Sequence, residues 1–353
     1  MSSKKESMKS LWLRCFPEDD EAYVNLFYSY YGHPRYYHTI EEEGKVISML
    51  HHIDTYRYAF FGKEFRSSYI YAACTAPEQR GKGLMGQLME KTFLTLHEKR
   101  IPLSVTIPAT EELFAFYGRF GFVPAFKRWY KRWNGSPFPD DPSIKSMSLH
   151  YDLPNELILD WLTTTINSRL SGNMRHTPRD IRFVLDSTRL SGGFNVGLAN
   201  GKDELEAFAI VERTDFTLRV REYIATSPRA ICNLFELLRL SSPLPVCIEE
   251  AENEEAENKE EETFFGAARI VDLPMLMKTF ASHRAIRGSE TFYIKDPLIP
   301  ANNGLYHLAD KRFSFQPCVP PEEAEQGIPV YDIAAYTRKL FDMEPGHMTL
   351  MMD

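Results

Sequence analysis

One stretch, residues 67–98, constrains the fold of this 353-residue chain more than any other. It opens with an apolar, aromatic run from Tyr69 to Thr75, which predicts a strand because it is short, β-prone and followed by Pro77. Apolar side chains then recur at helical spacing, at Met85, Met89, Phe93 and Leu96. A basic turn with two glycines, residues 79–83, lies where the predicted strand meets the predicted helix.

This turn predicts an anion site. The first amides of a helix have no intrahelical acceptor and point outward at the positive end of the helix dipole. Gly81 and Gly83 would let an anion approach the backbone closely, so we expect a pyrophosphate here. The turn lacks the acidic partner of the dinucleotide fingerprint GxGxxG, and it does not match the nucleoside-triphosphate loop GxxxxGK[ST].

Composition argues against several other classes of protein. The five cysteines are odd in number, widely spaced and free of CxxC pairs, which predicts reduced thiols with neither a disulfide framework nor a metal site. The net charge of −8 argues against a nucleic-acid partner. No apolar run approaches the ~20 residues of a membrane span, and the N-terminus lacks the apolar middle of a secretory signal. We expect a cytoplasmic protein.

The remaining sequence predicts an α+β protein of three domains. Residues 1–130 hold two hairpins, the strand–turn–helix stretch and a further strand, after a frayed end that reaches about Met8. Residues 131–265 repeat the strand-then-helix order without the basic glycine turn, which predicts a degenerate copy. Their Glu-rich run, Glu249–Glu262, is expected to be a solvated loop or an exposed helix. Residues 266–353 form the third domain.

Two motifs in register resemble the GNAT superfamily of N-acetyltransferases. The turn matches the superfamily's Arg/Gln-x-x-Gly-x-Gly/Ala pattern from Arg80 to Met85, with Met at the last position. The run FYGRFGF, Phe116–Phe122, follows at the expected distance. The whole order, including RIVDLP at residues 269–274 and DPLIPANNGLYHL at residues 296–308, resembles the enhanced intracellular survival family.

The resemblance implies acetyl-CoA as cofactor, an amine of a small molecule or a peptide as acceptor, and no metal. It also implies a degenerate second GNAT domain, a sterol-carrier-protein-like last domain and a hexamer. Tyr117 would protonate the coenzyme thiolate, since its ordinary pKa of ~10 lies near the ~8.5 of a thiol. The α-carboxylate of Asp353 would accept the amine proton, and the Asp353 side chain is a second possible base. Alternatively, Tyr117 merely packs under the sheet.

The same resemblance assigns the cofactor contacts. Cys74 and Thr75 would line the pantetheine, and the pyrophosphate would lie on Arg80, Gly81, Lys82, Gly83, Leu84, Met85 and Gly86. Cys74 is the only thiol expected near this turn. It is expected to be a packed strand residue without an activating base, which favours direct transfer in a ternary complex over an acyl-enzyme.

An aromatic segment near the N-terminus allows two interpretations. Phe27, Tyr28, Tyr30 and Tyr31 either belong to the core side of an amphipathic helix or form the wall of a pocket for a cationic amine. Two functions other than enzyme also stay open for the chain: a non-catalytic acetyl-CoA-binding or lipid-binding regulatory protein, and an assembly scaffold.

Overall fold

The structure is a computed structural model with two compact units. It describes residues 2–135, 142–153, 155–168, 172–250, 261–281, 289–309, 312–324, 327–346, 348 and 351. The first unit comprises residues 1–126, 170–175 and 264–346, and the second comprises residues 127–169, 176–263 and 347–353. The chain therefore leaves the first unit within one strand, β6 (Val123–Arg132), and returns to it within another, β13 (Glu261–Ile270).

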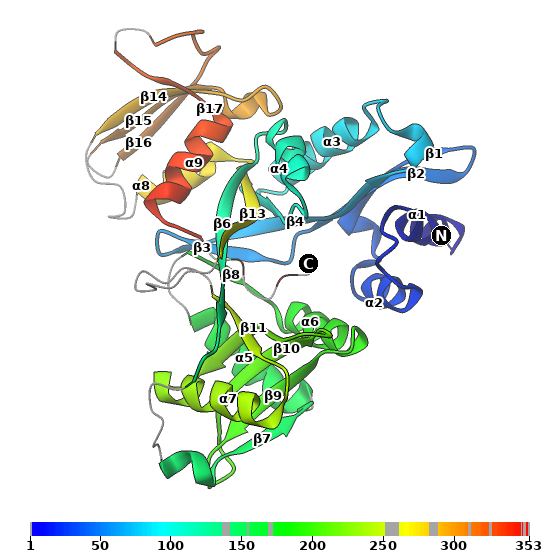
Figure 1. The fold of residues 1–353 in the computed structure, drawn as a ribbon. Coiled ribbons are helices and arrows are strands. Elements are labelled where there is room, and N and C mark those ends of the chain that lie inside the picture. The colour runs from blue at the N-terminus through cyan, green and yellow to red at the C-terminus, as the bar shows by residue number, and fades with distance from the viewer. Residues whose placement is uncertain are drawn as a thin grey trace. The chain divides into compact units, whose positions relative to one another are not determined.

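The strand–turn–helix stretch forms the centre of the first unit (Figure 1). The elements of its N-terminal part are α1 (Ser2–Cys15), α2 (Glu21–Tyr31), η1 (Pro34–Tyr36), β1 (Tyr37–Glu42), β2 (Lys45–Ile53), β3 (Arg57–Phe60), β4 (Lys63–Thr75), η2 (Pro77–Gln79), α3 (Leu84–Glu98), β5 (Leu103–Thr106) and α4 (Glu111–Gly118). The strand order in this unit is β1-β2-β4-β5-β13. Only β4 and β5 run parallel, because α3 carries the chain back between them.

Helices cover both faces of this sheet. On one face, Met89 and Phe93 of α3 are fully buried against Leu50 and Ile70 of the sheet. On the other face, Trp12 of α1 lies among the rings of α2 and the sheet. The predicted frayed end is wrong, since α1 begins at Ser2. Its apolar pattern is short, and its buried side chains are Met8, Leu11 and Trp12.

The C-terminal part of the first unit adds a second, smaller sheet. Its elements are α8 (Leu273–Ala281), β14 (Glu290–Lys295), η4 (Pro300–Asn302), β15 (Gly304–Ala309), β16 (Arg312–Pro317), β17 (Val330–Asp332) and α9 (Ile333–Met343). The strand order is β16-β15-β14-β17, with β14 and β17 parallel. A short strand from residues 172–175, β8 (Asn173–Arg175), pairs with β3. The likeness of this part to sterol carrier proteins stays a prediction.

A buried ion pair joins the two parts of the first unit. Arg269 of β13 contacts both carboxylate oxygens of Asp296 at 2.9 and 3.0 Å, and both side chains are at most 1% exposed. The Arg269 guanidinium also donates to the carbonyl oxygen of Phe120 at 2.6 Å and lies over the Phe93 ring. The RIVDLP and DPLIPANNGLYHL motifs therefore anchor the smaller sheet to the turn that follows α4.

The second unit repeats the arrangement of strands and helices seen around α3. Its elements are η3 (Pro142–Ser146), β7 (Ser148–Tyr151), α5 (Asn155–Ser168), α6 (Pro178–Leu190), β9 (Phe194–Ala199), β10 (Leu205–Arg213), β11 (Leu218–Ala225), α7 (Pro228–Ser241) and β12 (Val246–Glu250), together with the end of β6. The strand order is β6-β12-β11-β10-β9-β7, and the parallel pair is again the one joined by a helix, here α7.

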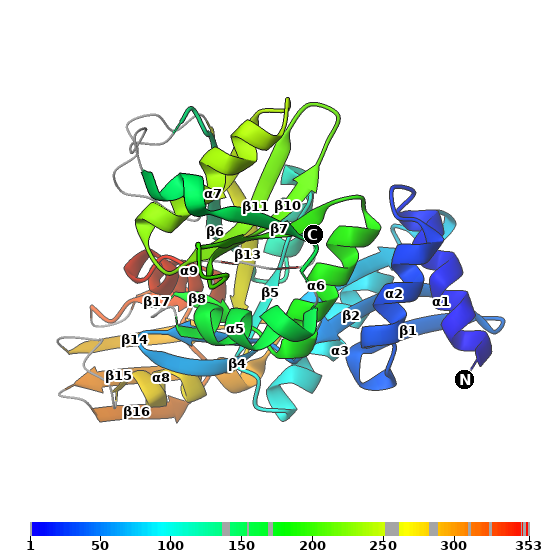
Figure 2. The ribbon, with the colours of Figure 1, turned by 90° about the horizontal axis from the view of Figure 1, so that it is seen from below.

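Helices cover both faces of the second sheet as well. Helices α5 and α6 lie on one face and α7 on the other (Figure 2). Phe208 and Ile210 pack with residues of α5 and α6, whereas Ala207 and Ala209 pack with residues of α7. The turn before α7 differs from the one before α3, because the Ser227 side chain accepts a hydrogen bond from the amide of Ala230. The expectation of a loop or helix for the Glu-rich run is wrong at its two ends, because residues 249–250 end β12 and residues 261–262 begin β13. Residues 251–260 of the run lie outside the described residues.

Candidate active site

The basic turn of the first unit presents uncapped amides at the start of α3. Gly81 and Gly83 have φ values of 80° and 74°, which are costly for residues with a side chain. A Cβ atom at either glycine would meet no atom within 4 Å, so the space in front of this backbone is open. Gly83 is the N-cap and offers no side-chain acceptor, unlike Ser227 at the start of α7. The turn can therefore bind an anion through its amides.

Two cationic side chains flank these amides. Arg80 and Lys82 are exposed. The Arg80 Nε atom donates to the carbonyl oxygen of Thr75 at 3.2 Å, and the Lys82 Nζ atom donates to the Gln79 side chain at 2.6 Å. Both contacts are to neutral acceptors, so the positive charges remain available to an anion such as a pyrophosphate.

Strands β4 and β5 part before they reach this turn. Their parallel pairing covers Ser67–Ile70 on β4 and ends at Thr106 on β5. Strand β4 continues to Thr75, so in the described part of the chain the β5-facing backbone of residues 71–75 has no strand partner. A backbone segment without a strand partner on one side suits a ligand with amide groups of its own, because such a ligand can pair with it as a strand would.

A β-bulge shapes the same segment. The pairing of β2 with β4 shifts register between Met49 and His51, so that Leu50 lies opposite both Ala72 and Ala73. Ala72 has a φ of 46°, an unfavourable conformation for a residue with a Cβ atom. Bulges are common beside active sites, where they redirect backbone groups. The sequence analysis missed this feature, because no glycine marks the strained position.

Tyr117 lies beside the point at which β4 and β5 part. It belongs to α4, whose first turn is capped by the Thr110 hydroxyl. The side chain packs between the rings of Phe116 and Phe122, and the residue is 8% exposed. Burial raises the pKa of the Tyr117 phenol to about 12, while a hydrogen bond with Thr106, the last residue of β5, acts in the opposite direction. The phenol is therefore protonated at neutral pH.

Two thiols, rather than the expected one, lie near the cofactor turn. Cys74 is buried, and both its hydrogen bond to Cys15 and its burial raise the pKa of its thiol. The same hydrogen bond lowers the pKa of Cys15 to about 7, with a further contribution from Arg80, although burial opposes the shift. The Cys15 Sγ atom lies 3.6 Å from the carbonyl oxygen of Thr75. The sequence analysis missed Cys15 because 59 residues separate the two cysteines.

The aromatic residues proposed for a substrate pocket lie in the core of the first unit. Phe27, Tyr28 and Tyr31 are at most 2% exposed, while Tyr30 is partly exposed. The Phe27 and Tyr28 rings surround the buried imidazole of His51 at 4.9 and 5.5 Å. Their role in amine binding stays a prediction.

The C-terminal residue proposed as the base, Asp353, lies outside the described residues. Met348 and Met351, which are described in the second unit, are 4% and 1% exposed. The guanidinium of Arg221 donates to the carbonyl oxygen of Met351 at 3.2 Å. The last described part of the chain is thus held by burial and by a charged hydrogen bond within that unit.

The described residues show neither a cluster of metal ligands nor a membrane-spanning helix. No group of three or more His, Cys, Asp and Glu side chains among them is placed to hold a metal ion. Within the same residues, no helix is both long and apolar enough to cross a bilayer.

Comparison with known proteins supports the interpretation of the first unit. Residues 2–125 match the family model described as an acetyltransferase (GNAT) domain. No curated protein matches the sequence. Among solved structures, Eis1 from Mycobacterium abscessus superposes with a TM-score of 0.70 at 14% identity, covering 94% of this chain and 85% of that one.

Two further structures that match over most of the chain are GCN5-related N-acetyltransferases. The protein from Kribbella flavida has a TM-score of 0.71 at 16% identity, covering 100% of this chain and 98% of that one. The protein from Anabaena variabilis has a TM-score of 0.67 at 19% identity, covering 93% and 85%. Residues 2–125 therefore form a GNAT acetyltransferase domain, and nearly the whole chain shares the mixed α+β fold of these proteins.

Proposed function

We propose that this chain transfers the acetyl group of acetyl-CoA to a primary amine by direct attack in a ternary complex. The observation that carries the proposal is the continuity of two features: the end of β4, which has no strand partner on its β5-facing side, leads directly into the uncapped amides of α3. The first would bind the two amides of pantetheine, and the second would bind the pyrophosphate. Both are needed for coenzyme A, and at the corresponding helix of the second unit, α7, the Ser227 side chain caps the first amides.

Tyr117 is proposed as the acid that protonates the departing thiolate. The pKa of the Tyr117 phenol, about 12, lies ~3.5 units above that of a free thiol. With a thiol of ordinary pKa, transfer of the proton from the phenol to the thiolate would cost ~5 kcal/mol. However, burial is the main cause of the shift, and a thiolate formed at the same site would lose hydration as well. Because both groups lose hydration, the pKa difference between phenol and thiol is smaller in the site than this figure. The neutral phenol is the form that can donate a proton.

Attack by the amine itself is favoured over attack by the Cys74 thiol. Cys74 has a raised pKa and stays a neutral thiol, which is a poor nucleophile. The amine must lose a proton, and we propose that the α-carboxylate of Asp353 accepts it, on the resemblance to the enhanced intracellular survival family. The hexamer and the sterol-carrier-like last domain rest on the same resemblance.

A thiol-release assay with acetyl-CoA tests the proposal. It would be run against aminoglycosides, polyamines, amino acids and lysine peptides, and at least one amine should accelerate release of coenzyme A. Tyr117→Phe should lower kcat by ~10²-fold or more, while the exposed Tyr151→Phe serves as the matched control. Deletion of Asp353 should have an effect of similar size. Binding of acetyl-CoA without turnover on any amine would refute the proposed activity.

A further inference from the structure

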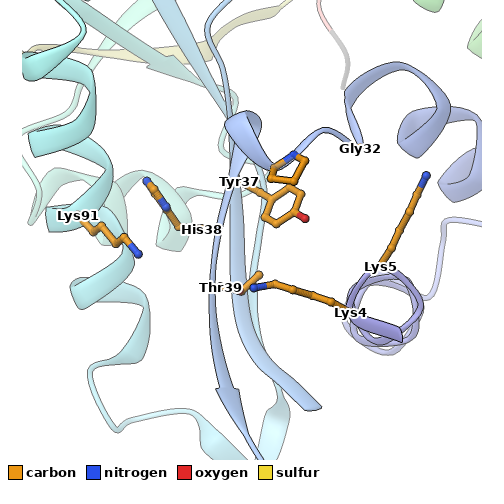
Figure 3. Close-up of a pocket in the computed structure, with 8 residues that line it drawn as sticks. Lys4, Lys5, Gly32, Tyr37, His38, Thr39 and Lys91 are labelled. Atoms are coloured by element: carbon orange, nitrogen blue, oxygen red, sulfur yellow. The ribbon is translucent and has the colours of Figure 1, made fainter. Parts of the chain in front are cut away.

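A cavity of about 510 Å³ lies at the outer edge of β1 in the first unit, away from the cofactor turn. Three lysines line it: Lys4 and Lys5 from α1, and Lys91 from α3 (Figure 3). Lys91 is seven residues beyond Leu84, the first residue of α3, which corresponds to about 10 Å along the helix axis. The volume falls within the range of about 300–1,000 Å³ that is usual for ligand pockets.

The cavity reaches both faces of the sheet around one strand. The Tyr37 ring lies 5.8 Å from that of His51, on the face covered by α1 and α2. The neighbouring His38 faces the other way, and its Nε2 atom lies 3.3 Å from the Thr95 hydroxyl of α3. Strand β1 ends the strand order of the sheet, and among the described strands it pairs only with β2. Its outer edge therefore offers backbone groups between two sets of lysines.

The residues that line the cavity include three lysines and no carboxylate, although β1 itself ends in Glu41 and Glu42. Lys4 pairs with Glu41 at 2.5 Å. Lys5 donates to the carbonyl oxygen of Tyr28 at 3.2 Å, which leaves its charge uncompensated. In the described part of the chain, no carboxylate lies within ion-pair distance of Lys5 or Lys91. Burial, followed by the charges of Lys91 and Lys99, lowers the pKa of His38 to about 4.

We propose that the outer edge of β1 binds an extended acidic peptide, which pairs with it as an additional strand. Side chains of an extended strand alternate between the two faces. Acidic residues of one parity would thus reach Lys5, since Lys4 is already paired with Glu41, and those of the other parity would reach Lys91. A small anion would contact the lysines of only one face, so the arrangement on both sides of β1 favours a peptide. Main-chain hydrogen bonds would supply affinity, and the lysines would select for acidic sequences.

The binding test uses a fluorescent eight-residue peptide of alternating Glu and Val and its Gln-for-Glu counterpart. Fluorescence anisotropy at low salt should show saturable binding of the acidic peptide, at least tenfold weaker binding of the Gln peptide, and weakening as salt increases. Lys5→Gln combined with Lys91→Gln should weaken binding at least tenfold. Lys45→Gln, which removes an exposed lysine outside the cavity, should leave it unchanged.

A second measurement separates strand addition from simple charge attraction. Hydrogen exchange of the amides of residues 37–41 should slow at least tenfold when the acidic peptide binds. Equal binding of both peptides, or unchanged binding by the double lysine variant, would overturn the proposal. Displacement of the peptide by inorganic pyrophosphate without protection of β1 would instead identify a small-anion site. The outcome is independent of the acetyltransferase assay, because the cofactor turn is not altered.

Discussion

Replacing Asp296 with Asn should destabilise the first unit more than any conservative change on its surface. Every contact to this carboxylate comes from a donor: two from the guanidinium of Arg269 at 2.9 and 3.0 Å, one from the Asn302 amide at 2.9 Å, and two from the backbone amides of Leu298 and Ile299 at 3.1 and 3.2 Å. An asparagine would direct its own NH2 group at some of these donors. It would also leave the Arg269 charge unpaired in the core.

The size of the effect follows from the burial of both partners. Removing one member of a buried ion pair costs about 3–5 kcal/mol, because the remaining charge stays buried without compensation. At about 1.4 kcal/mol per factor of ten, amides that exchange through opening of this region should exchange about 10²–10⁴-fold faster. Hydrogen exchange followed by mass spectrometry, on peptides covering β13 and β15, measures this directly.

A surface ion pair provides the control. Glu322→Gln removes the partner of Lys295, but the Glu322 side chain is 86% exposed, and exchange should not change measurably. A change below threefold for Asp296→Asn would show that the carboxylate is dispensable. It would then refute the view that this ion pair holds the smaller sheet against the turn after α4.

Three further predictions concern the cofactor turn, the thiols and the buried histidines. Gly83→Ala should raise the KM for acetyl-CoA at least tenfold, because the new Cβ strains a residue at φ 74° and enters the open space in front of the amides. Gly192→Ala is the control: it introduces the same strain at φ 77° in the second unit and should leave KM unchanged. The rate of Cys15 alkylation by iodoacetamide should increase as pH rises through about 7 and then level off, whereas Cys74 should stay unmodified. Mass spectrometry of the peptides that contain the two cysteines measures both rates. A Cys15 rate that still rises at pH 9 would contradict the lowered pKa. Burial lowers the pKa of His51 to about 3. Between about pH 6.5 and pH 3, His51 is therefore protonated in the unfolded chain but neutral in the folded chain. The free energy of unfolding should fall by up to about 1.4 kcal/mol for each pH unit in this range. The His51→Phe variant should therefore lose less Tm between pH 7 and pH 5 than the unsubstituted chain. An equal loss of Tm would contradict the lowered pKa of His51.

Local patterns were sufficient to predict most of the individual elements. The strand before the cofactor turn and the helix after it were predicted from residue spacing and from Pro77, and the structure confirms them. The helix α1 was missed because its apolar pattern occupies only its last turns. Because this helix was not predicted, the positions of its residues Lys4 and Lys5 were not predicted either.

The sequence by itself determined which amides are left uncapped, since that depends on glycines and on the neighbouring strand and helix, all within about twenty residues. Tertiary structure alone decided what surrounds them: the end of pairing between β4 and β5, the bulge at Ala72, the approach of Cys15 to Cys74, and the pairing of Arg269 with Asp296. These features depend on contacts between segments that are distant in the chain, and such contacts form only when the sheet and its helices pack together. Burial, which sets the pKa of Tyr117, likewise exists only in the folded unit.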